Sequence, residues 1–161
     1  MAKPFSRRTS LLVVAGIVAA ALGLPYLGQM VFEPWARSPS GAPTLTGYWA
    51  GTVTFPGKGR VRVAMELYAP IHARRCGNCP EVKGDLKVCA SGHPVGYEVW
   101  GHVSDRRASS FSLLGRTSGA SLGGLEGWWQ GGDTLTVSLT DQAPGRWQLH
   151  RATESIFTDA C

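Results

Sequence analysis

The chain has 161 residues, of which 43% are apolar and 17% are charged, so its composition excludes a disordered polypeptide and fits one domain with an extension. The formal net charge is +5, but Lys3, Arg7 and Arg8 contribute +3 within residues 1–32, where no acidic residue occurs. The remaining +2 is spread over residues 33–161 without a clustered basic face, so we expect no nucleic-acid partner.

The N-terminus combines a basic segment, residues 1–10, with an uncharged and mostly apolar stretch, residues 11–32. A bilayer is crossed by ~20 apolar residues. The stretch therefore predicts one transmembrane helix, either an uncleaved anchor or a signal peptide cleaved near Ala21-Leu22-Gly23. Apolarity continues past that point and favours the anchor. The positive flank stays in the cytoplasm in both cases, so we expect a single-pass inner-membrane protein with a periplasmic or otherwise extracytoplasmic C-terminal domain.

Residues 33–43 contain three prolines together with serine and glycine, a composition typical of an extended linker. Trp35 follows the apolar stretch directly. Its indole either lies at the membrane interface, which tryptophan favours, or is an isolated linker residue.

Eight short segments in which apolar and polar residues alternate follow the linker. This period of two, with glycine-rich turns between the segments, predicts an all-β, eight-stranded antiparallel up-and-down barrel over residues 44–152. The interior of such a barrel is filled by side chains or holds one small ligand. The expected strands are residues 45–55, 60–67, 82–88, 97–103, 111–115, 125–130, 134–139 and 147–151.

The first strand opens with Leu45-Thr46-Gly47-Tyr48-Trp49, which resembles the Leu-Thr-Gly-x-Trp opening of avidin-type barrels and the Gly-x-Trp opening of lipocalins. This resemblance to the calycin-like barrels covers residues 45–152 as a pattern. It implies that Arg151, on the last strand, packs over Trp49 as a cation–π pair and closes the barrel base. The polar residues with which avidin binds biotin are absent after the motif, so we expect no biotin binding.

The four cysteines are Cys76, Cys79, Cys89 and Cys161, and an exported domain oxidises its thiols. Strand topology brings Cys161 towards Cys76 or Cys79, and we expect the pairs Cys76–Cys161 and Cys79–Cys89, which would fasten the tail, residues 153–161. The alternative is a zinc site made by Cys76, Cys79, Cys89 and His93. The length of the intervening strand separates the two halves of that site, so no metal and no other cofactor is expected.

Two surfaces are candidates for binding. Inward residues Tyr97, Phe111 and Trp129 would line a site for a small apolar ligand in the barrel interior. Outward residues Trp100, Leu114 and Trp128 lie on three neighbouring strands and form a candidate interaction patch.

The sequence holds no Ser/His/Asp or paired-carboxylate spacing that indicates catalysis, so we do not expect an enzyme. We expect a membrane-anchored module that binds a small apolar ligand or serves as an envelope accessory protein. The alternative is a protein-interaction module, such as a protease inhibitor or an assembly factor, that uses the outer patch.

Overall fold

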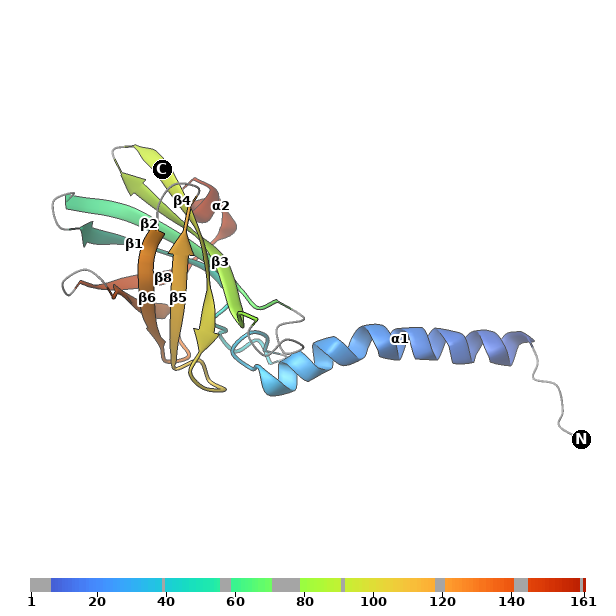
Figure 1. Ribbon diagram of the computed structural model, residues 1–161. Coiled ribbons are helices and arrows are strands. Elements are labelled where there is room, and N and C mark those ends of the chain that lie inside the picture. The colour runs from blue at the N-terminus through green and yellow to red at the C-terminus, as the bar shows by residue number, and fades with distance from the viewer. Residues whose placement is uncertain are drawn as a thin grey trace, which may run out of the picture.

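The computed structural model describes residues 7–38, 40–55, 59–70, 79–90, 92–117, 121–140, 145–159 and 161. One long helix precedes a barrel of eight strands, and a short helix follows it (Figure 1). The helices are α1 (Arg7–Phe32) and α2 (Glu154–Thr158). The strands are β1 (Gly47–Phe55), β2 (Gly59–Tyr68), β3 (Val82–Ala90), β4 (His93–Val103), β5 (Ser110–Arg116), β6 (Ser121–Trp129), β7 (Thr134–Leu139) and β8 (Arg146–Ala152).

The strands form a closed antiparallel barrel in sequence order, with β8 paired to β1. The predicted up-and-down barrel is therefore confirmed, and its topology is consistent with that of calycin-like barrels. Closure leaves no unpaired sheet edge in this ring of strands. The register at the seam places Trp49 opposite Arg151.

Alternation along each strand sends one set of side chains inward, where they form a single apolar core. The tightest contacts involve inward glycines. An added Cβ at Gly127 would lie 2.0 Å from Cζ of Phe111, and one at Gly101 would lie 1.8 Å from the carbonyl oxygen of Ser112. Close approach of these groups requires glycine, because any side chain there would displace a neighbour.

The two ends of the barrel differ. One end, where β1 begins and β8 ends, is covered by residues 33–38 and 40–46, and Trp35 and Leu45 are buried there. Trp35 therefore does not lie in an open linker or at a membrane interface. Its carbonyl accepts a hydrogen bond from the Leu45 N–H at 2.7 Å, which folds this segment against the core. The far end carries Val95, an inward residue that is still 39% exposed.

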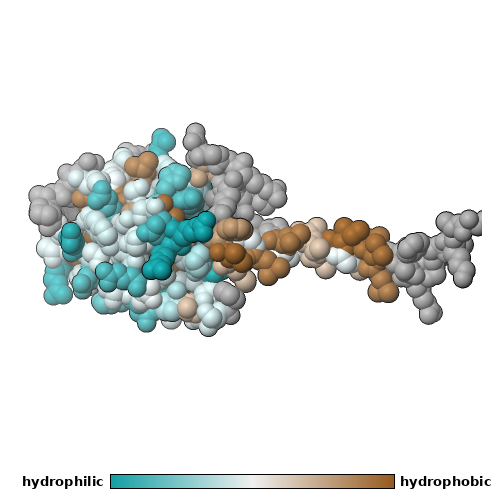
Figure 2. Space-filling model, turned by 90° about the horizontal axis from the view of Figure 1, so that it is seen from below, coloured by the Kyte–Doolittle hydropathy of each residue, from teal (hydrophilic) through white to brown (hydrophobic). Residues whose placement is uncertain are grey.

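Helix α1 extends away from the barrel (Figure 2). Most of its described apolar side chains are exposed, and Leu12 is 74% exposed. Nevertheless, no helix in the part of the chain that the structure describes is long and apolar enough to cross a membrane. The helical prediction for residues 11–32 is met, whereas the transmembrane helix is not confirmed.

Candidate functional site

The covered end of the barrel is fastened by one cation. The guanidinium carbon of Arg151 lies 3.9 Å from the centre of the Trp49 ring, which is the contact that the calycin-like resemblance implies. Arg151 also donates hydrogen bonds to the carbonyl oxygens of Thr44 and Thr46. Burial lowers the pKa of Arg151, while the nearby Asp133 carboxylate opposes that shift. These contacts hold residues 44–46 against the barrel and indicate a structural role.

The three inward residues that we considered as ligand contacts lie at different depths. Phe111 and Trp129 are buried and lie towards the covered end, whereas Tyr97 is half-buried in the middle of β4. Phe111 packs on Gly127, and the indole N–H of Trp129 donates to the Gly132 carbonyl at 2.8 Å. All three side chains pack in or against the core, so in this structure they fill space.

The outward patch divides into two parts. Trp100 and Leu114 are direct partners across β4 and β5, and Leu114 is 57% exposed. Trp128 pairs instead with Ser110, four residues along β5 from Leu114, and its ring lies 5.1 Å from the Arg146 guanidinium carbon. A strand rises ~3.3 Å per residue and neighbouring strands lie ~4.8 Å apart, so the Cα atoms of the two tryptophans are separated by about 16 Å.

The surface between the two tryptophans is hollowed into two adjoining cavities. One has a volume of about 480 Å³ and reaches Trp128, and the other has a volume of about 440 Å³ and reaches Trp100. His102, Ser112 and Glu126 line both. We call this surface the aromatic groove, and its principal residues are Trp100, His102, Ser112, Leu114, Glu126 and Trp128.

Polar side chains form the shared wall of the aromatic groove. His102 pairs with Ser112 across β4 and β5, and Ser112 pairs with Glu126 across β5 and β6, so the three form one row. Nδ1 of His102 lies 4.0 Å from Oε2 of Glu81, and that same oxygen accepts the Val103 N–H at 3.1 Å. Among the described residues, the side chains of Ser112 and Glu126 have no hydrogen-bonding or ion-pairing partner.

The cysteine pairing predicted from topology is wrong. Cys89 is joined to Cys161, not to Cys79, and Cys79 is itself disulfide-bonded. Cys76 lies outside the described residues. The prediction assumed that the tail stays at the end of the barrel where β8 stops. The tail instead turns back along the outer face to the end of β3, where Cys89 lies.

Cys79 and Cys89 both take part in disulfides, so they offer no thiolates for the alternative zinc site. In the described part of the chain, no group of three or more histidine, cysteine or acidic residues could hold a metal ion.

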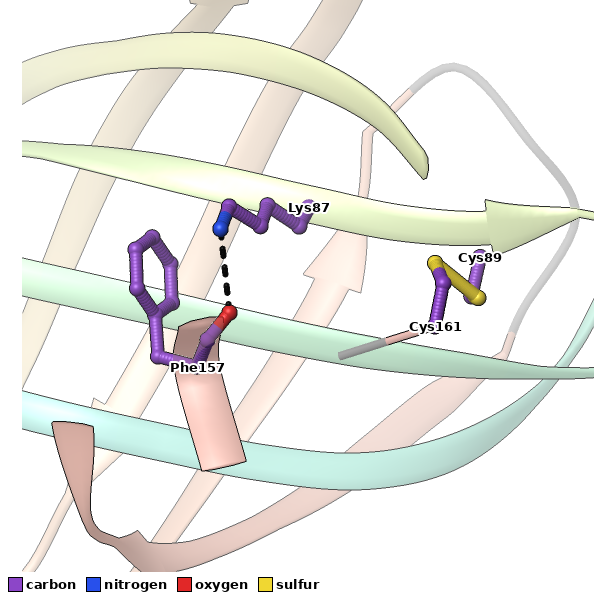
Figure 3. Close-up of a disulfide and its surroundings, with 4 residues drawn as sticks. All are labelled: Lys87, Cys89, Phe157 and Cys161. Carbon is purple, nitrogen blue, oxygen red and sulfur yellow. Dashed lines mark hydrogen bonds between the residues drawn. A yellow bond between two sulfur atoms is a disulfide. The ribbon is translucent and has the colours of Figure 1, made fainter. Parts of the chain in front are cut away.

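Helix α2 explains the path of the tail. The Nζ of Lys87 donates to the Phe157 carbonyl at 3.0 Å and lies 4.2 Å from the centre of the Phe157 ring (Figure 3). Tyr48 packs on the same ring, with the ring centres 5.6 Å apart. Phe157 and Cys161 thus fasten the tail across the outer faces of β1 to β3. The sequence carried a signal for this helix, since Thr153 and Glu154 precede the apolar pair Ile156-Phe157, as at a helix start.

Comparisons with protein-family models, with curated proteins and with solved structures find no match to this chain. The function must therefore be inferred from the site.

Proposed function

We propose that the protein is an extracytoplasmic accessory module, held at a membrane by its N-terminal segment, that binds an envelope component through the aromatic groove. The observation that carries this proposal is the contrast between the two surfaces considered. The inward glycines and aromatic residues are in close contact, whereas the groove is open and bears partnerless polar groups between two half-buried tryptophans.

Two features support the location. Basic residues precede an uncharged stretch of the N-terminal segment, and the described apolar side chains of α1 are exposed over much of its length. Apolar surface of this extent is typical of a segment that meets a membrane or a partner. Disulfides persist in oxidising compartments, so the Cys89–Cys161 bond supports export of the barrel.

Location is tested by membrane fractionation of cells expressing the full chain, followed by alkylation of free thiols without reduction. We expect the protein in the membrane fraction with Cys89 and Cys161 unmodified. Recovery in the cytosolic fraction with alkylated cysteines would contradict the proposed location.

Binding through the groove is tested by photocrosslinking in intact cells. A benzophenone side chain is placed at position 114, inside the groove, or at position 156, on α2. Leu114 is 57% exposed and Ile156 is 51% exposed, so the two positions form a matched pair. We expect an adduct from position 114 only. Equal adducts from both positions, or none from position 114, would count against the groove as the binding surface.

A second candidate function is the binding of a small apolar ligand at the far end of the barrel, where Val95 lies. The exposure of the inward residue Val95, beside half-buried Val88 and Tyr97, favours it. Here a lipophilic fluorescent probe should bind to the full chain and be excluded by Val95→Trp. The same fluorescence with the wild type and this variant would argue against that site.

A further inference from the structure

The two tryptophans of the aromatic groove are arranged like the ends of an extended binding surface. The Cα atoms of Trp100 and Trp128 are about 16 Å apart across three strands, from strand rise and spacing, and each side chain lines a different cavity. This separation exceeds what one small ring could bridge. A ligand that contacts both indoles must therefore be elongated and must follow the surface of the sheet.

The wall between the tryptophans is polar and offers both kinds of hydrogen-bonding group. The Ser112 hydroxyl donates and accepts, the Glu126 carboxylate accepts, and the His102 ring donates at one nitrogen and accepts at the other when neutral. Ser112, Glu126 and His102 are all exposed. A ligand seated here meets both donors and acceptors, as an array of hydroxyl groups requires.

Charges of both signs border the groove. Glu126 in the shared wall and Glu81 beside His102 are negative, and Arg146 lies over the ring of Trp128 at the groove's end. The two carboxylates disfavour an acidic ligand and Arg146 disfavours a strongly basic one, so the groove suits an uncharged molecule rich in polar groups.

We propose that the aromatic groove binds a short, linear, uncharged oligosaccharide. This inference rests on the proposed function, in that it names the class of the envelope component. One face of a pyranose ring presents C–H groups, and the negative face of an indole attracts such positively polarised edges. If one sugar ring packs on Trp100 and another on Trp128, the sugar units between them lie over the shared wall. Their hydroxyl groups would then exchange hydrogen bonds with Ser112 and Glu126.

A protein partner fits the groove less well. The centre of a protein interface is typically depleted of charged residues and rich in apolar contact. The centre of this groove is instead the row of His102, Ser112 and Glu126, and Leu114 is its one strongly exposed large apolar side chain among the described residues.

The test is a calorimetric titration of the full chain with N,N′,N″,N‴-tetraacetylchitotetraose and with maltotetraose, both of which are uncharged. The chain is held in phospholipid nanodiscs, because glycoside detergents would compete for the groove. We expect at least one oligosaccharide to bind and Trp128→Ala to weaken its binding by about tenfold or more. Ser112→Tyr fills the shared wall from an exposed position and should abolish binding without a change in the unfolding midpoint. Ile156→Tyr introduces the same side chain on α2 and should bind as the wild type does.

Two results would overturn the inference. One is the absence of binding by both oligosaccharides, and the other is binding that Ser112→Tyr and Ile156→Tyr leave equally strong. The photocrosslinker at position 114 then distinguishes a wrong ligand class from a wrong binding surface. If protease removes the adduct and Ser112→Tyr prevents its formation, then the groove is a binding surface, but its ligand is a protein and not a sugar. The absence of any adduct would overturn the proposed function as well.

Discussion

Arg151 and Trp49 are direct neighbours across the seam of the barrel, where β8 meets β1, and the guanidinium carbon lies 3.9 Å from the centre of the indole ring. The same guanidinium donates to the carbonyl oxygens of Thr44 and Thr46, ahead of the first strand. One side chain thereby joins the strands that close the barrel to the segment that covers its end.

Replacement of Arg151 by methionine should lower the free energy of unfolding by about 2–4 kcal/mol, because it removes the cation–π contact and the hydrogen bonds from the guanidinium to two carbonyl groups. Arg151→Lys keeps the charge but loses the planar, two-pronged donor geometry of the guanidinium. Its free energy of unfolding should lie between those of the methionine variant and the wild type. Urea unfolding measures both variants. A loss below about 1 kcal/mol for methionine would show that other contacts hold the seam.

The barrel was predictable because its signal is local. Period-two alternation fixes which residues face inward, and short turns force neighbouring strands to pair. Val61, Val63, Met65 and Leu67 of β2 were expected inward and are buried. Burial of Trp35 was not predictable, because the prolines around it indicate an extended linker and only contacts with the distant barrel draw it into the core.

The double variant Cys89→Ser/Cys161→Ser should release the tail. Its two positions are 72 residues apart, and the chain-entropy account of such a closure gives an upper limit of about 4 kcal/mol. The measured loss should be smaller, because the tail can detach while the barrel stays folded. We therefore expect rapid proteolysis within residues 153–161 and a moderate fall in the unfolding midpoint. Unchanged proteolysis would show that Phe157 and Lys87 alone hold the tail.

The aromatic groove could be predicted from the sequence only in part. Alternation correctly places Trp100, Leu114 and Trp128 on the outside of three successive strands, but it does not give the stagger between strands. The register of β5 against β6 sets Trp128 opposite Ser110 and brings Ser112 and Glu126 between the tryptophans. This polar wall was missed, because Ser112 and Glu126 have no distinguishing sequence context.

The loop between β4 and β5 should confer sensitivity to acid. Asp105 accepts hydrogen bonds from the Ser109 hydroxyl and from the N–H groups of Ser109 and Arg107, and these lower the pKa of Asp105. The unfolded-state pKa of aspartate is ~3.9. The ionised carboxylate therefore stabilises the fold above that pH, and this contribution is lost as the pH falls through the lower folded-state pKa.

Asp105→Asn should accordingly flatten the dependence of the unfolding midpoint on pH below about pH 4, relative to the wild type. Asp159→Asn, at an exposed aspartate on the tail, is the control. A wild-type slope in Asp105→Asn would mean that the acid-sensitive group lies elsewhere.

A substitution at Gly127 tests whether the barrel interior is full. A Cβ at this position would lie 2.0 Å from Cζ of Phe111, whereas one at Gly96 would meet no atom within 4 Å. Overpacking of a filled core costs about 1–3 kcal/mol, so Gly127→Ala should lower the free energy of unfolding and Gly96→Ala should not. Phe111→Leu, added to Gly127→Ala, should recover part of the loss by making room. If Gly127→Ala is instead as stable as Gly96→Ala, then the interior can accept added volume, and a ligand within the barrel becomes a better explanation of function than the aromatic groove.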